Sequence, residues 1–467
     1  MHTVSLRKAF SLSSLVLSAC LLLAQSQLAA QTQSSEKGEG RLAVYAENPR
    51  YLQDANGKPV FILGYSDSWK KQPPIVLDQL QGKVNYLRTA YASNNEFYFP
   101  IDYAVGNPIV KRPSGLWDFD AWDETFWSNL HDYLNDTKKR GFIVGFMIWD
   151  GHWSLPKGKA GHSSLWNSNK NVQGIQWAYD YDALINYSDP SSNSTDPRER
   201  LVYYQRRWID RFIDEVKDFP HVLIELYNET HQASESWWLW WADYFIRKGN
   251  FVIATTWNSK HTISDSTLSK DSRLHMKSYH KRSSDVITPI RLSWKKVIVA
   301  DADTSGIDLD AESARKIAWK SLMKGGHWND YMEGSSYPKG NPFPNGTKIS
   351  YYGTLLNFLT TRSVPFAEMS PDDSLVSTGN ALVKPGSDYL VYVEAGVKPV
   401  HFEAGVKLNL SGASGRLRYE WYDPRSGTTA ASGQVQGGTV RAFSPPSRGD
   451  LVLWVHKADS AVTVSQD

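Results

Sequence analysis

Short apolar runs alternate with amphipathic helical patterns along most of the chain, and this alternation restricts the fold more than any other feature. Eight strand-like runs lie at 60–64, 84–91, 141–150, 221–230, 251–257, 274–280, 296–303 and 325–332, and most have polar residues at or near their ends. Helical spacing of apolar residues follows at 118–140, 198–219, 234–249, 311–324 and 350–362. Strands that alternate with helices pair in parallel. Eight such units across about 300 residues predict an α/β fold, a (β/α)8 barrel. We place this barrel at residues 41–368.

The pattern changes after Pro365. From about Asp373 onward, short alternating runs are separated by Gly, Pro and Ser turns, with no helical pattern between them. Regular short strands with turn signals predict a small antiparallel β-sandwich. We place this module at residues 369–458 and a loose tail at 459–467.

The N-terminus has the organisation of a secretory signal. Arg7 and Lys8 precede an apolar run at 9–24, and small residues surround Ala30. This order predicts a signal peptide at residues 1–30 and therefore a secreted or periplasmic protein. The run is too short to predict a membrane span. The polar residues 31–40 predict a disordered linker.

The single cysteine of the chain, Cys20, lies inside this apolar run. Together with the preceding Leu17-Ser18-Ala19 it resembles a bacterial lipobox, so a lipid anchor at Cys20 is the alternative to cleavage near Ala30. In either case the mature domains contain no disulfide, and their stability must come from packing.

Charge gives no reason to expect a polyanionic partner. The chain has 51 basic and 49 acidic residues and a net charge of +2, so nucleic acid is not predicted as a partner. The 19 Trp and 24 Tyr residues fit either large packed cores or rings that stack on sugars. No cluster has the spacing of metal ligands, and we expect neither a metal nor a cofactor.

Polar residues collect where the predicted strands end, which is the face on which such barrels build their sites. In the clearest case an apolar run stops at Asn228 and Glu229, and ionised Glu is rarely buried unpaired. The seventh strand ends with Asp301 and Asp303, which share a face, and Glu333 follows the eighth strand. The remaining candidates for substrate binding are Arg88, Trp149, Asp150, His152, Trp257, Tyr279 and His280.

Strands four and seven lie on opposite sides of an eight-stranded barrel, so their carboxylates can face each other across a pocket. Glycosidic cleavage needs such a pair, because one carboxyl protonates the leaving oxygen while the other attacks the anomeric carbon or activates water. We therefore predict Glu229 as the acid/base and Asp301 or Asp303 as the second carboxylate. Glu333 is the reserve candidate for that second role.

The motif Tyr227-Asn228-Glu229 resembles the strand-four motif of the clan-A glycoside hydrolases. In that family the acid/base follows an Asn on strand four and the nucleophile ends strand seven, while Arg88 and Tyr279 match its strand-two arginine and strand-six aromatic residue. The segments NPRYLQDANGKPVFILG, YEWYDPRSG and PPSRGDLVLW also resemble secreted glycosidases with a collagen-binding-like C-terminal sandwich. The resemblance implies a retaining hydrolase that cleaves O-glycosidic bonds of a polysaccharide or a derived oligosaccharide.

One position departs from the family pattern. The clan has Glu on strand seven, whereas KVIVADAD has Asp301 in that place, one methylene shorter. Two other functions therefore stay open: a non-catalytic carbohydrate-binding barrel, and a polysaccharide lyase with Tyr279 or His280 as its base. Trp149, Trp153, Trp166 and Trp177 are candidates for sugar stacking because they lie at a strand end or in the insertion after it.

Overall fold

The computed structural model describes residues 40–66, 75–90, 108–150, 165–228, 233–257, 263–281, 283–302, 309–331, 346–394 and 405–457. At positions 75, 76, 90, 150, 257 and 331 it describes the backbone and not the side chain. The predicted signal peptide, nearly all of the predicted linker and the predicted tail lie outside the described residues.

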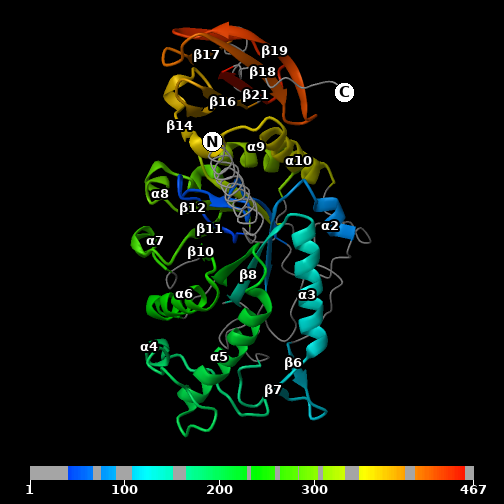
Figure 1. The fold of residues 1–467 in the computed structure, drawn as a ribbon, viewed down its shortest axis with the longest axis vertical. Coiled ribbons are helices and arrows are strands. Elements are labelled where there is room, and N and C mark those ends of the chain that lie inside the picture. Colours follow the sequence, from blue (N-terminus) through cyan, green and yellow to red (C-terminus); the bar gives the residue numbers. More distant parts are fainter. Residues whose placement is uncertain are drawn as a thin grey trace, which may run out of the picture. The chain divides into compact units, whose positions relative to one another are not determined.

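Eight parallel strands form a closed barrel, in the order β4, β5, β8, β9, β10, β11, β12 and β13, with β13 paired back to β4 (Figure 1). Their bounds are β4 Leu63–Ser66, β5 Tyr86–Ala90, β8 Ile143–Asp150, β9 Val222–Asn228, β10 Ile253–Trp257, β11 Met276–His280, β12 Val297–Asp301 and β13 His327–Tyr331. The predicted α/β barrel is therefore confirmed.

Helices surround these strands (Figure 1). They are α2 Ile75–Leu80, α3 Glu124–Lys139, α4 Tyr181–Leu184, α5 Pro197–Val216, α6 Glu235–Gly249, α7 Asp265–Lys270, α8 Pro289–Ser293, α9 Ala311–Met323 and α10 Gly346–Thr361, with short 3-10 turns at Ser284–Val286, Phe366–Glu368 and Asp373–Leu375. Side-chain caps set where the long helices begin: Asp123 accepts hydrogen bonds from the first turn of α3, and Ser234 does the same for α6. Asn250, with a φ of 49°, ends α6 in the left-handed conformation.

Two local predictions need correction. Residues 118–122 do not begin a helix, because they belong to strand β7 (Trp117–Trp122), which forms a hairpin with β6 (Ile109–Lys111). The alternation in WDFDAW has the two-residue period of a strand, which accounts for this. The first predicted run also divides: β3 (Pro59–Val60) joins a small sheet with β1 (Ala43–Val44) and β2 (Leu52–Gln53), and the barrel strand begins at Leu63.

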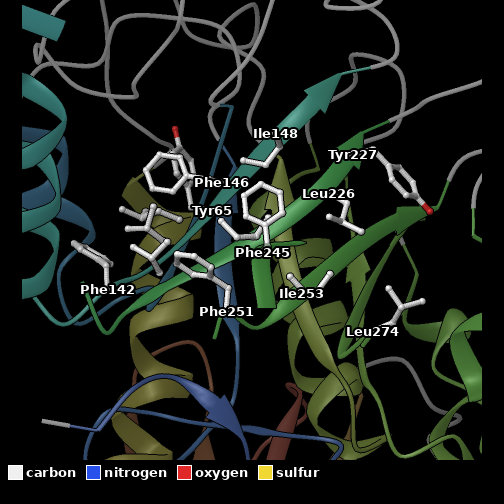
Figure 2. Close-up of a cluster of buried hydrophobic side chains, with 14 of the residues drawn as sticks. Tyr65, Phe142, Phe146, Ile148, Leu226, Tyr227, Phe245, Phe251, Ile253 and Leu274 are labelled. Atoms are coloured by element: carbon white, nitrogen blue, oxygen red, sulfur yellow. The ribbon is translucent and has the colours of Figure 1, made fainter. Parts of the chain in front are cut away.

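Two apolar cores hold the barrel together. The inner one contains Leu52 of the small sheet with Tyr86, Leu223 and Val297, and it fills the end of the barrel at which the strands begin. The outer one lies between strands and helices. Figure 2 shows part of it, where Phe146 of β8, Leu226 of β9 and Phe245 of α6 gather. All of these side chains are buried, so extensive apolar packing stabilises the barrel.

The C-terminal residues form the predicted antiparallel structure. A six-stranded sheet has the order β14-β15-β16-β21-β18-β19, and β17 pairs with β20 in a second sheet. Their bounds are β14 Ser370–Pro371, β15 Asn380–Lys384, β16 Asp388–Val393, β17 Val406–Asn409, β18 Arg416–Asp423, β19 Thr428–Gln436, β20 Val440–Phe443 and β21 Leu451–Lys457. One face of the larger sheet encloses a separate core with β17 and β20. Its other face packs on the barrel, where Tyr392 stacks on Trp319 of α9, with ring centroids 6.1 Å apart.

Candidate active site

The interior of the barrel changes from apolar to polar toward the C-terminal ends of the strands. Side chains two positions apart on a strand share a face. Five strands carry an inner-core residue followed two positions later by a buried polar residue: Tyr86 and Arg88, Leu223 and Glu225, Ala254 and Thr256, Met276 and Ser278, Val299 and Asp301. The polar members therefore form one interior layer at the end of the barrel where such folds build their sites.

Arg88 of β5 and Glu225 of β9 form the best-defined contact in this layer. The guanidinium Nε donates to Oε2 at 2.7 Å, and Nη2 donates to Oε1 at 2.6 Å. Each side chain is only 1% exposed. The hydroxyl of Thr256 on β10 also donates to Glu225. A buried carboxylate is stable only when it is paired and hydrogen-bonded, and Glu225 meets both conditions.

Arg88 also binds Asn228 at the end of β9. Its Nη2 donates to Oδ1 of Asn228 at 2.8 Å, and Asn228 is 3% exposed. A guanidinium only donates, so the oxygen of the Asn228 amide must face Arg88. The amide nitrogen, with its two N–H donors, is therefore directed away from Arg88.

Strands β11, β12 and β13 supply the other side of the layer. His280, Asp301 and Asn329 are register partners on these adjacent strands, and all three are buried. The Asn329 amide donates to the Ser66 hydroxyl of β4 at 2.6 Å. Polar side chains thus continue from β11 around to β4, where the barrel closes.

Carboxylates from both sides of the layer affect the pKa of Tyr86. Burial raises the pKa of its hydroxyl well above its usual range, the Glu225 carboxylate raises it further, Arg88 opposes this and Asp301 raises it again. Carboxylates from β9 and β12 therefore act on the same interior point. Gly145 of β8 makes room for this hydroxyl, because a Cβ at that position would lie 2.3 Å from the oxygen.

Tyr279 lies on the outer side of β11. Its hydroxyl donates to Asp265 of α7 at 2.6 Å, and the Arg291 guanidinium lies 4.0 Å from its ring centroid. Burial and the Asp265 carboxylate raise the pKa of Tyr279, which makes its phenolate harder to form. A lyase base must lose its proton, so this placement does not favour Tyr279 in that role.

Trp149 is fully buried among other rings. Its centroid lies 5.7 Å from Trp177, 5.9 Å from Trp208 of α5 and 5.7 Å from Trp237 of α6. Trp166 belongs to the same cluster and is 1% exposed. The structure therefore places Trp149, Trp166 and Trp177 in packing and not at a surface where sugars could stack. Their interpretation as sugar-stacking residues is corrected accordingly.

For several candidate residues the sequence is the only evidence of a role. Glu229, Asp303, His152, Trp153 and Glu333 lie outside the described residues, and Asp150 and Trp257 are described by their backbone alone. Glu229 directly follows Asn228, and Asp303 lies two residues beyond Asp301. Their roles stay predictions.

Glu225 is the residue that the sequence-based prediction missed. A signal was present, since it is the one charged residue inside the apolar run VLIELY, and a buried charge requires a partner.

Within the described ranges, no group of three His, Cys, Asp or Glu side chains is placed to hold a metal ion. No helix in the same ranges has the length and apolar character needed to cross a membrane.

Two kinds of known protein are similar to this chain. Residues 379–456 match the family model described as "Putative collagen-binding domain of a collagenase". One solved structure, described as "Glycoside hydrolase", has a TM-score of 0.58 and 16% identity, over 91% of this chain and 98% of the other. A glycoside hydrolase family 5 protein from Bacteroides vulgatus has a TM-score of 0.61 and 15% identity, over 90% of this chain and 93% of the other.

These similarities show that the chain has the fold of glycoside hydrolases across the barrel and the C-terminal sheet. The predicted resemblance to clan A with a collagen-binding-like C-terminal domain is thereby confirmed at the level of fold. No curated protein matches the sequence.

Proposed function

We propose that the protein is a glycoside hydrolase that cleaves O-glycosidic bonds of a polysaccharide or a derived oligosaccharide, with retention at the anomeric carbon. The observation that supports this most is the buried polar layer, in which Arg88, Glu225 and Asn228 approach from one side and Asp301 from the other. The fold similarity agrees with the proposal.

Glu229 is the proposed acid/base. It directly follows Asn228, whose amide is fixed by Arg88 at the C-terminal end of β9. In a retaining reaction its carboxyl protonates the leaving oxygen, and the second carboxylate attacks the anomeric carbon to form a glycosyl–enzyme intermediate. Glu229 then takes a proton from the water that hydrolyses this intermediate. The amide nitrogen of Asn228 donates to the sugar or to a catalytic carboxylate.

Asp301 is the proposed nucleophile. It ends β12 on the interior face, and its charge reaches Tyr86 together with that of Glu225. Asp303 and Glu333 are the alternatives for this role. Replacing each in turn, as Asp301→Ala, Asp303→Ala and Glu333→Ala, separates them. Only the nucleophile variant should regain substrate cleavage with added azide, which occupies the space of the lost carboxylate, attacks the anomeric carbon and is released as a glycosyl azide.

The main test is Glu229→Gln. We expect turnover to fall by about three powers of ten or more, since the variant loses the proton transfer, while the melting temperature is unchanged. Release of reducing sugar from a glycan panel gives the rate, and NMR of the first product gives the anomer. Glu124→Gln, an exposed change paired with Arg211, is the control. Full activity of Glu229→Gln on a cleaved substrate would remove this assignment.

A non-catalytic carbohydrate-binding barrel is the second candidate function. The fully buried Asp301 in place of the usual Glu favours it. Calorimetry with the same glycan panel distinguishes the two functions, because binding without any cleaved product supports the second.

We also propose that the protein is exported through residues 1–30. The mass of the mature N-terminus decides between cleavage near Ala30 and a lipid anchor on Cys20. A diacylglycerol adduct that Cys20→Ser removes would support the anchor.

A further inference from the structure

Glu225 has no role in the two-carboxylate mechanism, although it belongs to the buried polar layer. It is 1% exposed and accepts from two guanidinium nitrogens of Arg88 and from the Thr256 hydroxyl. These donors come from β5 and β10, on either side of β9 in the barrel order. The carboxylate is therefore held in one orientation by two other strands.

The same guanidinium nitrogen that binds Glu225 also binds Asn228. Nη2 of Arg88 lies 2.6 Å from Oε1 of Glu225 and 2.8 Å from Oδ1 of Asn228. The bidentate contact with Glu225 fixes the plane of the guanidinium. That plane in turn fixes which way the Asn228 amide points.

We propose that Glu225 is a positioning residue that orients and neutralises Arg88, so that Asn228 directs its amide nitrogen toward the substrate. This inference rests on the proposed glycosidase function, because it assigns Asn228 a donor role at that site. Glu225 acts through Arg88 and Asn228, without contact with the sugar.

Charge neutralisation is the second part of this role. A glycosidase acid needs a raised pKa, whereas a nearby unpaired guanidinium would lower it. Glu225 cancels the charge of Arg88 at a distance of 2.6 Å. Among the described residues, the other titratable groups that face this layer are Tyr86 of β5, His280 of β11 and Asp301 of β12.

The test compares Glu225→Gln with the double variant Arg88→Gln/Glu225→Gln. In Glu225→Gln the guanidinium of Arg88 stays charged and loses the Glu225 carboxylate. We expect kcat to fall about 100-fold from misplacement of Asn228, and the basic limb of the pH–rate profile to move down by about one unit. The double variant has no net charge at this point, so its basic limb should return to the wild-type pH while kcat stays low.

Asp450→Asn is the matched control. It breaks another buried bidentate Arg–carboxylate pair, that of Arg315 and Asp450, on the outer side of the barrel. It should lower the melting temperature without moving the pH limb. If Glu225→Gln does not fold, Glu225→Asp keeps the charge, and its limb should stay at the wild-type pH while kcat falls.

Crystal structures of the wild type and of Glu225→Gln give a reading that does not depend on activity. We expect the Asn228 amide to rotate away from its wild-type orientation in the variant. An unchanged Asn228, or an unchanged pH limb in a folded Glu225→Gln, would overturn the inference. A wild type that cleaves no glycan would overturn the proposed function, and the two crystal structures would then still decide whether Glu225 positions Asn228.

Discussion

Arg315 of helix α9 and Asp450, which precedes strand β21, form a buried ion pair between the barrel and the C-terminal sheet. Nε and Nη2 of the guanidinium lie 3.0 Å and 2.8 Å from the two carboxylate oxygens, and both side chains are at most 2% exposed. The Tyr392 hydroxyl donates to the same carboxylate at 2.9 Å. A contact of this kind requires a fixed geometry, so the C-terminal sheet packs in a fixed position on α9 and is not a tethered module.

Arg315→Met should destabilise the protein strongly. The change leaves the buried Asp450 carboxylate with only the more distant Arg425, 3.9 Å away, as a cation, and breaking a buried pair costs about 3–5 kcal/mol. Denaturant unfolding measures the difference. The carboxylate of Glu312, which is 55% exposed, also pairs with Arg315. Glu312→Gln removes this exposed pair and should cost less than about 1 kcal/mol. Equal losses in the two variants would contradict this ranking.

Removal of the C-terminal sheet should make the barrel insoluble. A chain that ends at residue 368 exposes Trp319 of α9 and Phe358 of α10, whose rings pack on Tyr392 and on Tyr422 of the sheet. A contiguous apolar patch of this kind promotes aggregation. Soluble yield and melting temperature of the truncated chain are the measurements. A soluble barrel with the melting temperature of the full chain would show that the sheet is an independent module.

The architecture of the chain could be predicted from its periodicity because strands β8, β9 and β12 carry short apolar runs of strand length between amphipathic helical patterns. The β6–β7 hairpin was missed because the six residues of WDFDAW precede a long amphipathic pattern and were merged with it. Asp123 marks the boundary, since its side chain caps α3. A cap of this type is visible in sequence only when the strand before it is also recognised.

Only part of the candidate site could be predicted from the sequence. Arg88 and Asn228 were chosen because polar residues at strand ends meet in a barrel, and the structure does bring them together. Glu225 was missed because it lies inside an apolar run, where only a partner from another strand explains a charge. Trp149 is six positions from the inward-facing Ile143, yet its ring packs among the outer rings. Regular alternation does not predict such a departure at a strand end.

The variant Trp149→Ala tests whether Trp149 serves packing or sugar binding. Its ring contacts Trp177, Trp208 and Trp237, so its removal leaves a cavity, and we expect a loss of about 3–5 kcal/mol. Trp149→Phe should lose clearly less. A sugar-stacking residue would behave differently, because its removal would weaken glycan binding in calorimetry while stability stayed constant. That second pattern would restore the sugar-stacking interpretation of this tryptophan.

One buried histidine, His327, and one partly buried histidine, His275, should make the fold sensitive to mild acid. Nδ1 of His327 accepts from the Ile62 backbone N–H at 2.9 Å, and its Nε2 lies 2.8 Å from the carbonyl oxygen of Arg50. Nδ1 of His275 accepts from the Ile253 N–H at 2.9 Å. In both rings Nδ1 must carry no proton, because a protonated nitrogen cannot accept these hydrogen bonds. Burial lowers the pKa of each histidine from 6.5 to about 4.

Stability should therefore fall as pH decreases from about 6.5 toward 4. In this window the unfolded chain binds a proton on each histidine and the folded chain does not, so each contributes a slope of about 1.4 kcal/mol per pH unit. Above pH 6.5 neither state is protonated at these rings, and this contribution is constant. His275→Asn keeps an oxygen that accepts from Ile253, and it should reduce the slope by that amount in denaturant unfolding at several pH values. A slope equal to that of the wild type in His275→Asn would show that this ring is protonated in the folded protein.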